Sequence, residues 1–234
     1  MDNFTLTRLI IAITAIIVVL VFAYHKTFAK KNPLTARFIA RTGLFAAMSV
    51  ILYIVPGLKF SVPFFPSFLE LHFDEIPALI AGFAYGPLSG FFVILTKTIV
   101  KLPLTTTLTV GEIADFIYSC AFVIPAAFIY KKHKNIKGAL ISLLVGTLIQ
   151  VITSSFITSF IMLDFYVFMM GWPKEAILGL CQLANPNVTS LGWTFLFLVA
   201  LPFNAFKDVI VVIITLLLYK RLHKVIDKIG AQKN

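Results

Sequence analysis

The chain has 234 residues, of which 59% are hydrophobic and 13% charged, whereas a soluble domain carries about 25% charged residues. With a mean hydropathy of +0.97, this composition excludes a soluble, disordered or fibrous protein and favours an integral membrane protein, because only a bilayer covers so much apolar surface. The net charge of +10 does not indicate a nucleic-acid partner, since the basic residues stand between apolar runs rather than on a polar face.

The first apolar run of membrane-spanning length covers residues 6–24 and stops at the basic stretch 25–31. One basic residue, Arg8, precedes its uninterrupted apolar part at 9–24, and no small-residue cleavage site follows it. This pattern favours a retained helix over a cleaved secretory signal. We therefore expect residues 1–31 to form an additional N-terminal transmembrane helix followed by a basic cytoplasmic loop.

The later apolar runs predict six more helices, at residues 36–55, 75–85, 88–102, 110–130, 138–163 and 193–219. The run at 75–85 is short and meets Gly86-Pro87, a pair that helices rarely cross. It is either the short member of a tight helical hairpin or one half of a broken helix. The connections 59–74, 102–109 and 164–192 are predicted to be loops, the last with room for a short helix.

Basic residues concentrate on one side of these helices. Fourteen of the 20 Lys and Arg stand in the segments 26–41, 131–137 and 220–233, and Asp227 is the one acid on that side. Lys and Arg are retained on the cytoplasmic side of a membrane. We therefore expect a multi-pass protein with its C-terminus in the cytoplasm, its N-terminus outside and its three long connections facing outward.

Four ionisable residues are predicted near the outer ends of two neighbouring helices. Lys97 and Lys101 are four apart, and Glu112 and Asp115 are three apart, so each pair lies on one helix face. Ion pairs between them would clamp the two helices together, because buried charges are usually paired. The alternatives are that one of them contacts a ligand, or that all four form the proton relay of a stand-alone secondary transporter.

Asn204 and Lys207 follow Pro202 in the last predicted helix, where the proline makes the helix locally irregular. An amide beside an ammonium group can recognise a flat heteroaromatic edge that bears carbonyls and ring nitrogens. The alternative is structural, with Lys207 paired to Asp208 or to another carboxylate.

Two further features are candidate ligand contacts. The helix 138–163 carries a polar stripe at spacing four, Gln150, Ser154 and Thr158. Such stripes hold helices together by hydrogen bonds, and the outer end of this one, Thr158 with Asp164, is the better candidate for a ligand contact. The first outer loop gathers four aromatic residues, Phe60, Phe64, Phe65 and Phe68. They either cover an aromatic ligand or form an interfacial belt.

Small residues at spacing four mark close helix approach on the second predicted helix. They are Ala36 with Ala40 and Gly43 with Ala47. A partner subunit and intramolecular packing explain this surface equally well.

The motifs GxxxxGK[ST], HExxH and GxSxG are missing, and Cys120 and Cys181 do not stand in a metal-ligand spacing. We therefore expect no catalytic residues, no resident cofactor and no metal. A membrane enzyme that acts on a lipid substrate is the less favoured alternative.

Several strings from residue 36 onwards resemble one known family. They are FLELHFDEIPALIAGFAYGPLSG at 68–90, VGEIADF at 110–116 and LPFNAFKDVIVVIITLLLYKRL at 201–222. The chain is similar to the substrate-binding S components of energy-coupling factor (ECF) vitamin transporters, most of all to the riboflavin-specific branch. The resemblance covers about residues 36–228.

This resemblance implies an all-α integral membrane protein of the bacterial cell membrane. Its S-component core of six helices would cover residues 32–228, the helix within 1–31 would be additional, and 229–234 would be a cytoplasmic tail. It implies a high-affinity vitamin-binding subunit that delivers its substrate to an ATP-driven module. That module comprises a transmembrane coupling subunit and two ATP-binding cassette ATPases, and it docks on the small-residue face of the first core helix.

Asn204 and Lys207 occupy the PFNxxK positions that contact the flavin ring in the riboflavin branch. The string FDE at 73–75 stands where that branch has FSD. Two departures are Thr158-Ser159-Phe160 in place of Asn-Tyr-Phe, and Asp164 in place of a proline. The resemblance implies riboflavin as the ligand, with a pyridoxine-like vitamin and pantothenate as alternatives. The substrate contacts expected from all these arguments are Asn204, Lys207, Thr158, Asp164, Phe65, Phe68, Glu112 and Lys97.

Overall fold

The computed structural model of the protein describes residues 35–231, with side chains up to Arg221. The chain divides into two compact units, Met1–Ala40 and Arg41–Asn234. In the described part of the first unit, the Thr35 hydroxyl accepts a hydrogen bond of 3.2 Å from the backbone N–H of Phe38, which caps the start of a helix. The helix predicted at 6–24 lies outside the described residues.

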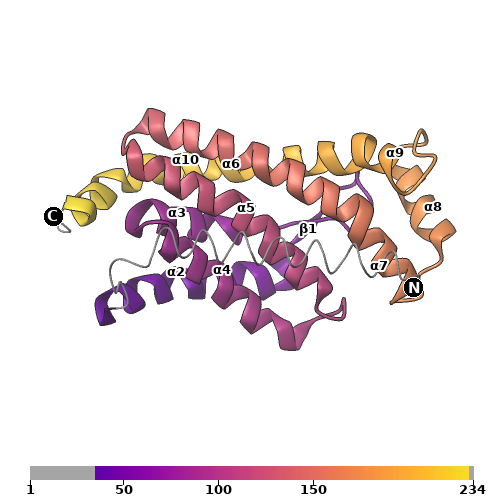
Figure 1. Ribbon diagram of the computed structural model, residues 1–234, viewed down its shortest axis with the longest axis horizontal. Coiled ribbons are helices and arrows are strands. Elements are labelled where there is room, and N and C mark those ends of the chain that lie inside the picture. The colour runs from indigo at the N-terminus through magenta and orange to yellow at the C-terminus, as the bar shows by residue number, and fades with distance from the viewer. Residues whose placement is uncertain (1–34, 232–234) are drawn as a thin grey trace. The chain divides into compact units, whose positions relative to one another are not determined.

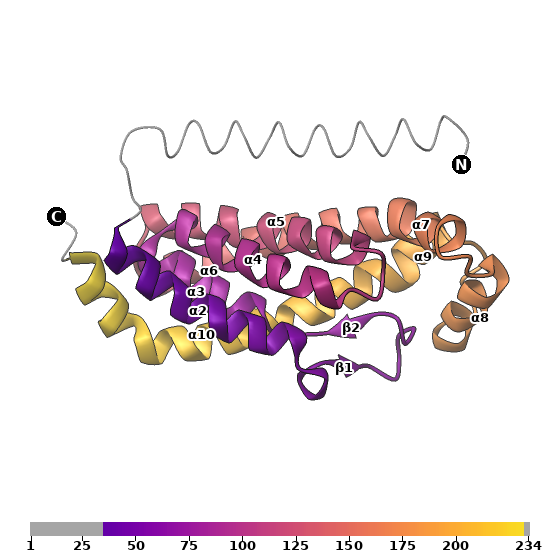
Figure 2. The ribbon, with the colours of Figure 1, turned by 90° about the horizontal axis from the view of Figure 1, so that it is seen from below.

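The second unit is a bundle of helices that run side by side (Figures 1 and 2). They are α2 (Ala36–Ile54, from Arg41 onwards in this unit), α3 (Glu75–Tyr85), α4 (Pro87–Lys101), α5 (Val110–Lys132), α6 (Ile136–Ile157) and α10 (Leu201–Ala231). In the described part of the chain, five helical stretches are long and apolar enough to cross a membrane, and α3 is a shorter apolar helix. The predicted all-α, multi-pass membrane fold is therefore confirmed.

Helices α3 and α4 form a hairpin, which is one of the two predicted arrangements. Gly86 ends α3 with a φ of +99°, a conformation that favours glycine, and Pro87 opens α4, where its missing N–H is harmless. A Cβ added at Gly90 would lie 2.7 Å from Val123 Cγ1 of α5 and 3.4 Å from Gly82 Cα of α3. The absence of a side chain there lets three helices approach closely.

The three long connections gather towards one end of the bundle (Figure 2). The first contains the 3-10 turn η1 (Pro56–Leu58) and the strands β1 (Phe60–Ser61) and β2 (Glu70–Leu71), which pair antiparallel with Phe60 opposite Leu71. The second begins with the 3-10 turn η2 (Leu102–Leu104). The third contains α8 (Lys174–Ala184), the short helix for which the sequence left room.

Two helices continue through π-helical turns that the sequence did not predict. Helix α6 passes through η3 (Thr158–Met162) into α7 (Leu163–Phe168), and α9 (Trp193–Phe195) passes through η4 (Leu196–Ala200) into α10. The helix end predicted at 163 is therefore wrong, because the apolar residues that follow extend the helix to Phe168. Asp164 lies in this helix and not in a loop.

Buried apolar side chains form two clusters. The larger fills the bundle, and the smaller lies at the loop end and includes Ile177 and Cys181 of α8 and Phe195 of α9. At the opposite end, the hydroxyl groups of Tyr130 and Tyr219 share a hydrogen bond of 2.8 Å that joins α5 to α10. The basic residues that follow these tyrosines therefore share one end of the bundle, away from the long connections.

Candidate functional site

A cavity of about 610 Å³ opens among the long connections and the adjoining helix ends of the second unit. This volume lies within the range of about 300–1,000 Å³ that is usual for small-molecule sites. Its aromatic lining includes Tyr53, Phe68, Tyr118, Tyr166, Trp172 and Phe203, and its polar lining includes Lys59, His72, Thr107, Glu112, Asn204 and Lys207. Such a wall can enclose a flat ligand and hydrogen-bond to its edges.

Five of the eight predicted substrate contacts line this cavity: Phe68, Glu112, Thr158, Asn204 and Lys207. The other three are not among its lining residues. Lys97 is completely buried, Phe65 packs edge-on against Phe203 with ring centroids 5.2 Å apart, and Asp164 is exposed on α7. The sequence thus placed residues from four separate segments around one site.

Asn204 and Lys207 lie one helical turn apart on α10, and both are held by hydrogen bonds. Asn204 Nδ2 donates to Ser155 Oγ of α6 at 3.1 Å and to the carbonyl of Ala200 at 2.9 Å. Lys207 Nζ donates to Glu75 Oε1 of α3 at 3.1 Å. The carboxylate partner of Lys207 is therefore Glu75 and not the neighbouring Asp208, and the paired lysine still lines the cavity.

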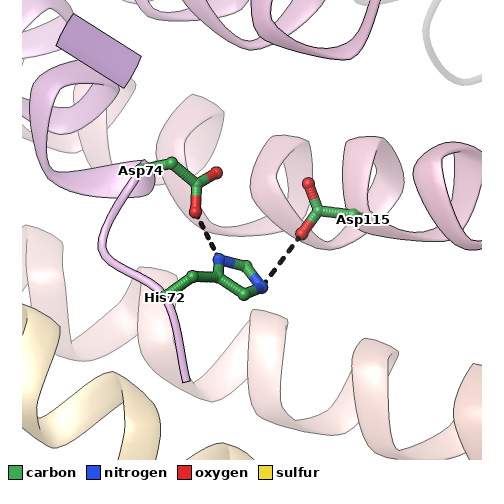
Figure 3. Close-up of side chains that lie close together, drawn as sticks. All are labelled: His72, Asp74 and Asp115. Carbon is green, nitrogen blue, oxygen red and sulfur yellow. Dashed lines mark hydrogen bonds and ion pairs between the residues drawn. The ribbon is translucent and has the colours of Figure 1, made fainter. Parts of the chain in front are cut away.

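A buried ionic network lies beside the cavity and joins the first outer connection to α4 and α5. The His72 ring stands between two carboxylates, with Nδ1 bonded to Asp74 and Nε2 3.6 Å from Asp115 Oδ1 (Figure 3). Lys97 Nζ contacts Asp74 Oδ2, lies 2.9 Å from Asp115 Oδ2 as an ion pair, and donates to Ser119 Oγ at 2.8 Å. Positive and negative side chains from three separate segments thus balance one another in the interior, away from water.

His72, Asp74 and Asp115 bring three potential metal-ligand atoms within 4.8 Å of one another. However, the ammonium group of Lys97 lies against both carboxylates and supplies the positive charge that a metal ion would bring. We therefore interpret the cluster as a structural network, because a buried carboxylate is stable when it is paired and hydrogen-bonded.

The predicted clamp between two lysines and two acids forms only in part. Lys97 pairs with Asp115, whereas Lys101 Nζ lies over the Tyr53 ring, 5.9 Å from its centroid. Glu112 Oε2 instead accepts hydrogen bonds from the hydroxyl groups of Thr105 and Thr107, at 2.8 Å and 3.1 Å. The loop before α5 folds back over the first turn of that helix, so its hydroxyl groups reach Glu112.

The polar stripe of α6 makes one hydrogen bond within its own helix and one to a neighbouring helix. Ser154 Oγ donates to Gln150 Oε1 at 3.4 Å within α6, and the hydroxyl of Thr158 shares a hydrogen bond of 3.1 Å with Tyr118 of α5.

Of the aromatic cluster in the first loop, Phe64 is 80% exposed and Phe60 is 49% exposed. The cluster therefore divides between the surface and the cavity wall.

The small-residue face of α2 is open at the positions described within the second unit. Gly43 and Ala47 are exposed, and a Cβ built at Gly43 meets no atom within 4 Å. Ala36 and Ala40 belong to the first unit, where both are exposed. Packing inside the second unit therefore does not account for small residues at 43 and 47.

The lining residues that sequence reasoning missed include Tyr53, His72 and Tyr118. Tyr118 is three residues after Asp115 and six after Glu112, so helical periodicity offered a signal. His72 stands two residues before Asp74 in the quoted FLELHFDE string, but only the fold shows that its ring reaches α5. Tyr53 belongs to an apolar run and carried no signal of its own.

The chain is similar to known proteins over most of its length. A family model described as "ECF transporter, substrate-specific component" matches residues 37–219. The riboflavin transporter RibU of Staphylococcus aureus is 29% identical over 182 residues, which cover 78% of this chain and 89% of RibU. The riboflavin transporter FmnP of Bacillus subtilis is 29% identical over 184 residues, covering 77% and 90% of the two chains. A solved structure of the S component of a bacterial ECF transporter superposes with a TM-score of 0.61 and 26% identity, covering 80% of this chain and 96% of that one.

Proposed function

The chain belongs to the family of substrate-specific components of ECF transporters, and from this premise we propose that it binds riboflavin or a closely related vitamin and delivers it to an ATP-driven module. The observation that carries the proposal is the cavity, in which Asn204 and Lys207 lie beside Tyr118, Tyr166 and Trp172. Riboflavin has a flat ring system with carbonyls and nitrogens at one edge. Aromatic walls suit its faces, and an amide with an ammonium group suits its edge.

The charge distribution supports an orientation for the proposed function. The segments 131–137 and 220–221 carry basic residues at the end of the bundle away from the cavity. Placing this end in the cytoplasm follows the retention of Lys and Arg there. The cavity then opens outward, where a nutrient arrives, and the C-terminus lies inside the cell. An added helix at 6–24 would place the N-terminus outside.

We assign the chain a binding role without catalysis, because its relatives are named as transporters. The energy would come from a module with a transmembrane coupling subunit and two ATP-binding cassette ATPases. The exposed small-residue face at Gly43 and Ala47 is the proposed docking surface, since small residues let membrane helices approach closely.

Reconstitution tests whether uptake requires the ECF module and ATP in addition to the chain. Liposomes that contain the chain together with an ECF module and ATP are expected to accumulate labelled riboflavin, and liposomes with the chain alone are not. Uptake by the chain alone, driven by a pH gradient and indifferent to ATP, would contradict the proposal and favour a stand-alone carrier.

Replacing Asn204 by alanine is expected to weaken riboflavin binding by about 1–3 kcal/mol, the range for losing a partner of a buried polar group. The measurement is a titration that follows the quenching of riboflavin fluorescence by purified protein. Asn187, which is exposed in the connection after α8, provides the matched control: Asn187→Ala should bind like the wild type. Equal affinities for the two variants would move the site away from α10.

Replacing Gly43 or Ala47 by leucine is expected to reduce association with the ECF module and to leave vitamin binding intact, because the added side chain keeps the helices apart. Co-purification with the module measures the first property and fluorescence titration the second. Leu148→Phe is the control, since Leu148 is a 63% exposed residue of α6. Normal association of both α2 variants would place the docking surface elsewhere.

A further inference from the structure

Asp208 is a buried acid for which the binding site has no evident use. It follows Lys207 on α10, its side chain is completely buried, and neither of its carboxyl oxygens has a hydrogen-bond partner among the described residues. Lys207 acts on it through its charge but gives it no hydrogen bond, because the ammonium group is bonded to Glu75. An ionised carboxylate in this position would lose its hydration and gain no hydrogen bond, a situation that buried acids avoid by binding a proton.

Among the residues that the structure describes, those around Asp208 add negative charge and provide no cation besides Lys207. The charged groups that act on it are Glu75 of α3 and Lys207 of its own helix. Glu75 is itself completely buried, and its Oε2 has no hydrogen-bond partner in the described structure. Helix α6, which also packs on α10, has no titratable residue between 138 and 157.

The buried charges of the described chain do not balance when every acid is ionised. Five buried acids, Asp74, Glu75, Glu112, Asp115 and Asp208, stand against two buried lysines, Lys97 and Lys207. His72 can add one positive charge beside Asp74 and Asp115, which still leaves an excess of acid. Glu112 accepts two hydroxyl hydrogen bonds, whereas Asp208 has neither a donor nor a cation of its own. A proton therefore relieves the excess best at Asp208.

We propose that Asp208 is a resident proton-binding site beneath the vitamin site: its carboxyl group carries a proton at neutral pH. The neutral group leaves Glu75 as the one negative partner of Lys207, so the ammonium group keeps its place in the cavity wall. Loss of the proton puts a second negative charge beside Lys207 and draws its ammonium group away from the cavity. The proton stays bound and is not carried across the membrane.

Infrared spectroscopy of the ligand-free, full-length protein in lipid nanodiscs tests the proton directly. A protonated carboxyl group has a carbonyl stretch above the amide I band, well separated from the bands of a carboxylate. We expect the wild type at neutral pH to show this band and Asp208→Asn, which keeps the shape of the side chain, to lose it. If the spectrum of the wild type minus that of Asp208→Asn shows carboxylate bands, Asp208 is ionised and the proposal is overturned. If the variant does not fold, labelling the wild-type aspartates with ¹³C must shift the band, and an unshifted band overturns the proposal.

A second arm, which rests on the proposed function, measures riboflavin affinity against pH where the vitamin itself does not ionise. As the pH rises and Asp208 loses its proton, the affinity of the wild type for riboflavin is expected to fall by up to about tenfold per pH unit. Asp208→Asn is expected to bind riboflavin equally well at every pH. Glu175→Gln, which removes an exposed carboxyl group of α8, should keep the wild-type profile. If the affinity of Asp208→Asn depends on pH as that of the wild type does, the proposed coupling between the Asp208 proton and riboflavin binding is overturned. Absence of riboflavin binding at every pH contradicts the proposed function and leaves the infrared result standing.

Discussion

Replacing Lys207 by methionine is expected to weaken riboflavin binding by about 1.5–3 kcal/mol, roughly 10- to 150-fold in Kd, the range for a hydrogen bond to a charged group. Methionine keeps the length and apolar stem of the side chain and removes the ammonium group. That group lines the cavity and lies 3.1 Å from Glu75 Oε1. The variant therefore loses the ligand contact and leaves Glu75 without its cation. Fluorescence titration of the purified variant gives the change in Kd.

Two effects of this substitution can be separated with a second change. Lys207→Met alone leaves a buried, unpaired carboxylate, which destabilises the fold. Lys207→Met combined with Glu75→Gln removes that charge as well, so stability should recover while affinity stays low. Recovery of both stability and affinity in the double variant would show that Lys207 acts only through the fold and does not contact the vitamin.

Replacing Lys97 by methionine is expected to lower the free energy of unfolding by about 3–5 kcal/mol, the usual cost of removing one partner from a buried ion pair. Lys97 is completely buried and lies between Asp74 and Asp115, so its loss leaves two carboxylates close together. A thiol-reactive dye measures the unfolding temperature, because Cys120 and Cys181 are free and buried in the folded protein. Burial also raises the pKa of the Cys181 thiol to about 11, which keeps it unreactive before unfolding.

Lys101→Met is the matched control for Lys97. Lys101 lies one turn further along α4 and contacts the face of Tyr53, and no ion pair is described for it. Its replacement should change stability by no more than about 0.5 kcal/mol, as is usual for residues outside such networks. Equal unfolding temperatures for the Lys97 and Lys101 variants would contradict the assignment of Lys97 to a stabilising network.

Much of the helical arrangement could be predicted because its signals are local. The pair Gly86-Pro87 separates α3 from α4 through a positive φ followed by a residue without an N–H, and both properties follow from residue type. Apolar run lengths gave the spans in the same way. The π-helical turns η3 and η4 were not predicted, since no residue type specifies an extra residue in one helical turn and packing between neighbouring helices selects it.

The candidate site could be predicted only where its residues follow helical spacing. Asn204 and Lys207 lie on one face of α10 because they are three apart, and both reach the cavity. The partner of Lys207 was open in the sequence, and the structure identifies it as Glu75, 132 residues away along the chain. Asp74 likewise meets Lys97 across 23 residues. Such pairs depend on how α3 packs against α4 and α10, which local spacing does not encode.

The arrangement connects the proposed vitamin site to the core of the bundle. Lys207 belongs both to the cavity wall and to an ion pair with Glu75, and Ser119 Oγ lies 3.5 Å from Glu75 Oε1 and accepts from Lys97. A ligand that contacts Lys207 would thus touch one end of a network that reaches α3, α4 and α5.

The most direct test of the account is an equilibrium titration of riboflavin with the purified wild-type chain in detergent, without any partner subunit. We expect quenching of the vitamin's fluorescence that saturates at one riboflavin per chain, with a Kd below about 1 μM, equivalent to about −8 kcal/mol. Absence of quenching, together with no competition by unlabelled riboflavin in a binding assay with labelled vitamin, would contradict the assignment of this cavity to riboflavin.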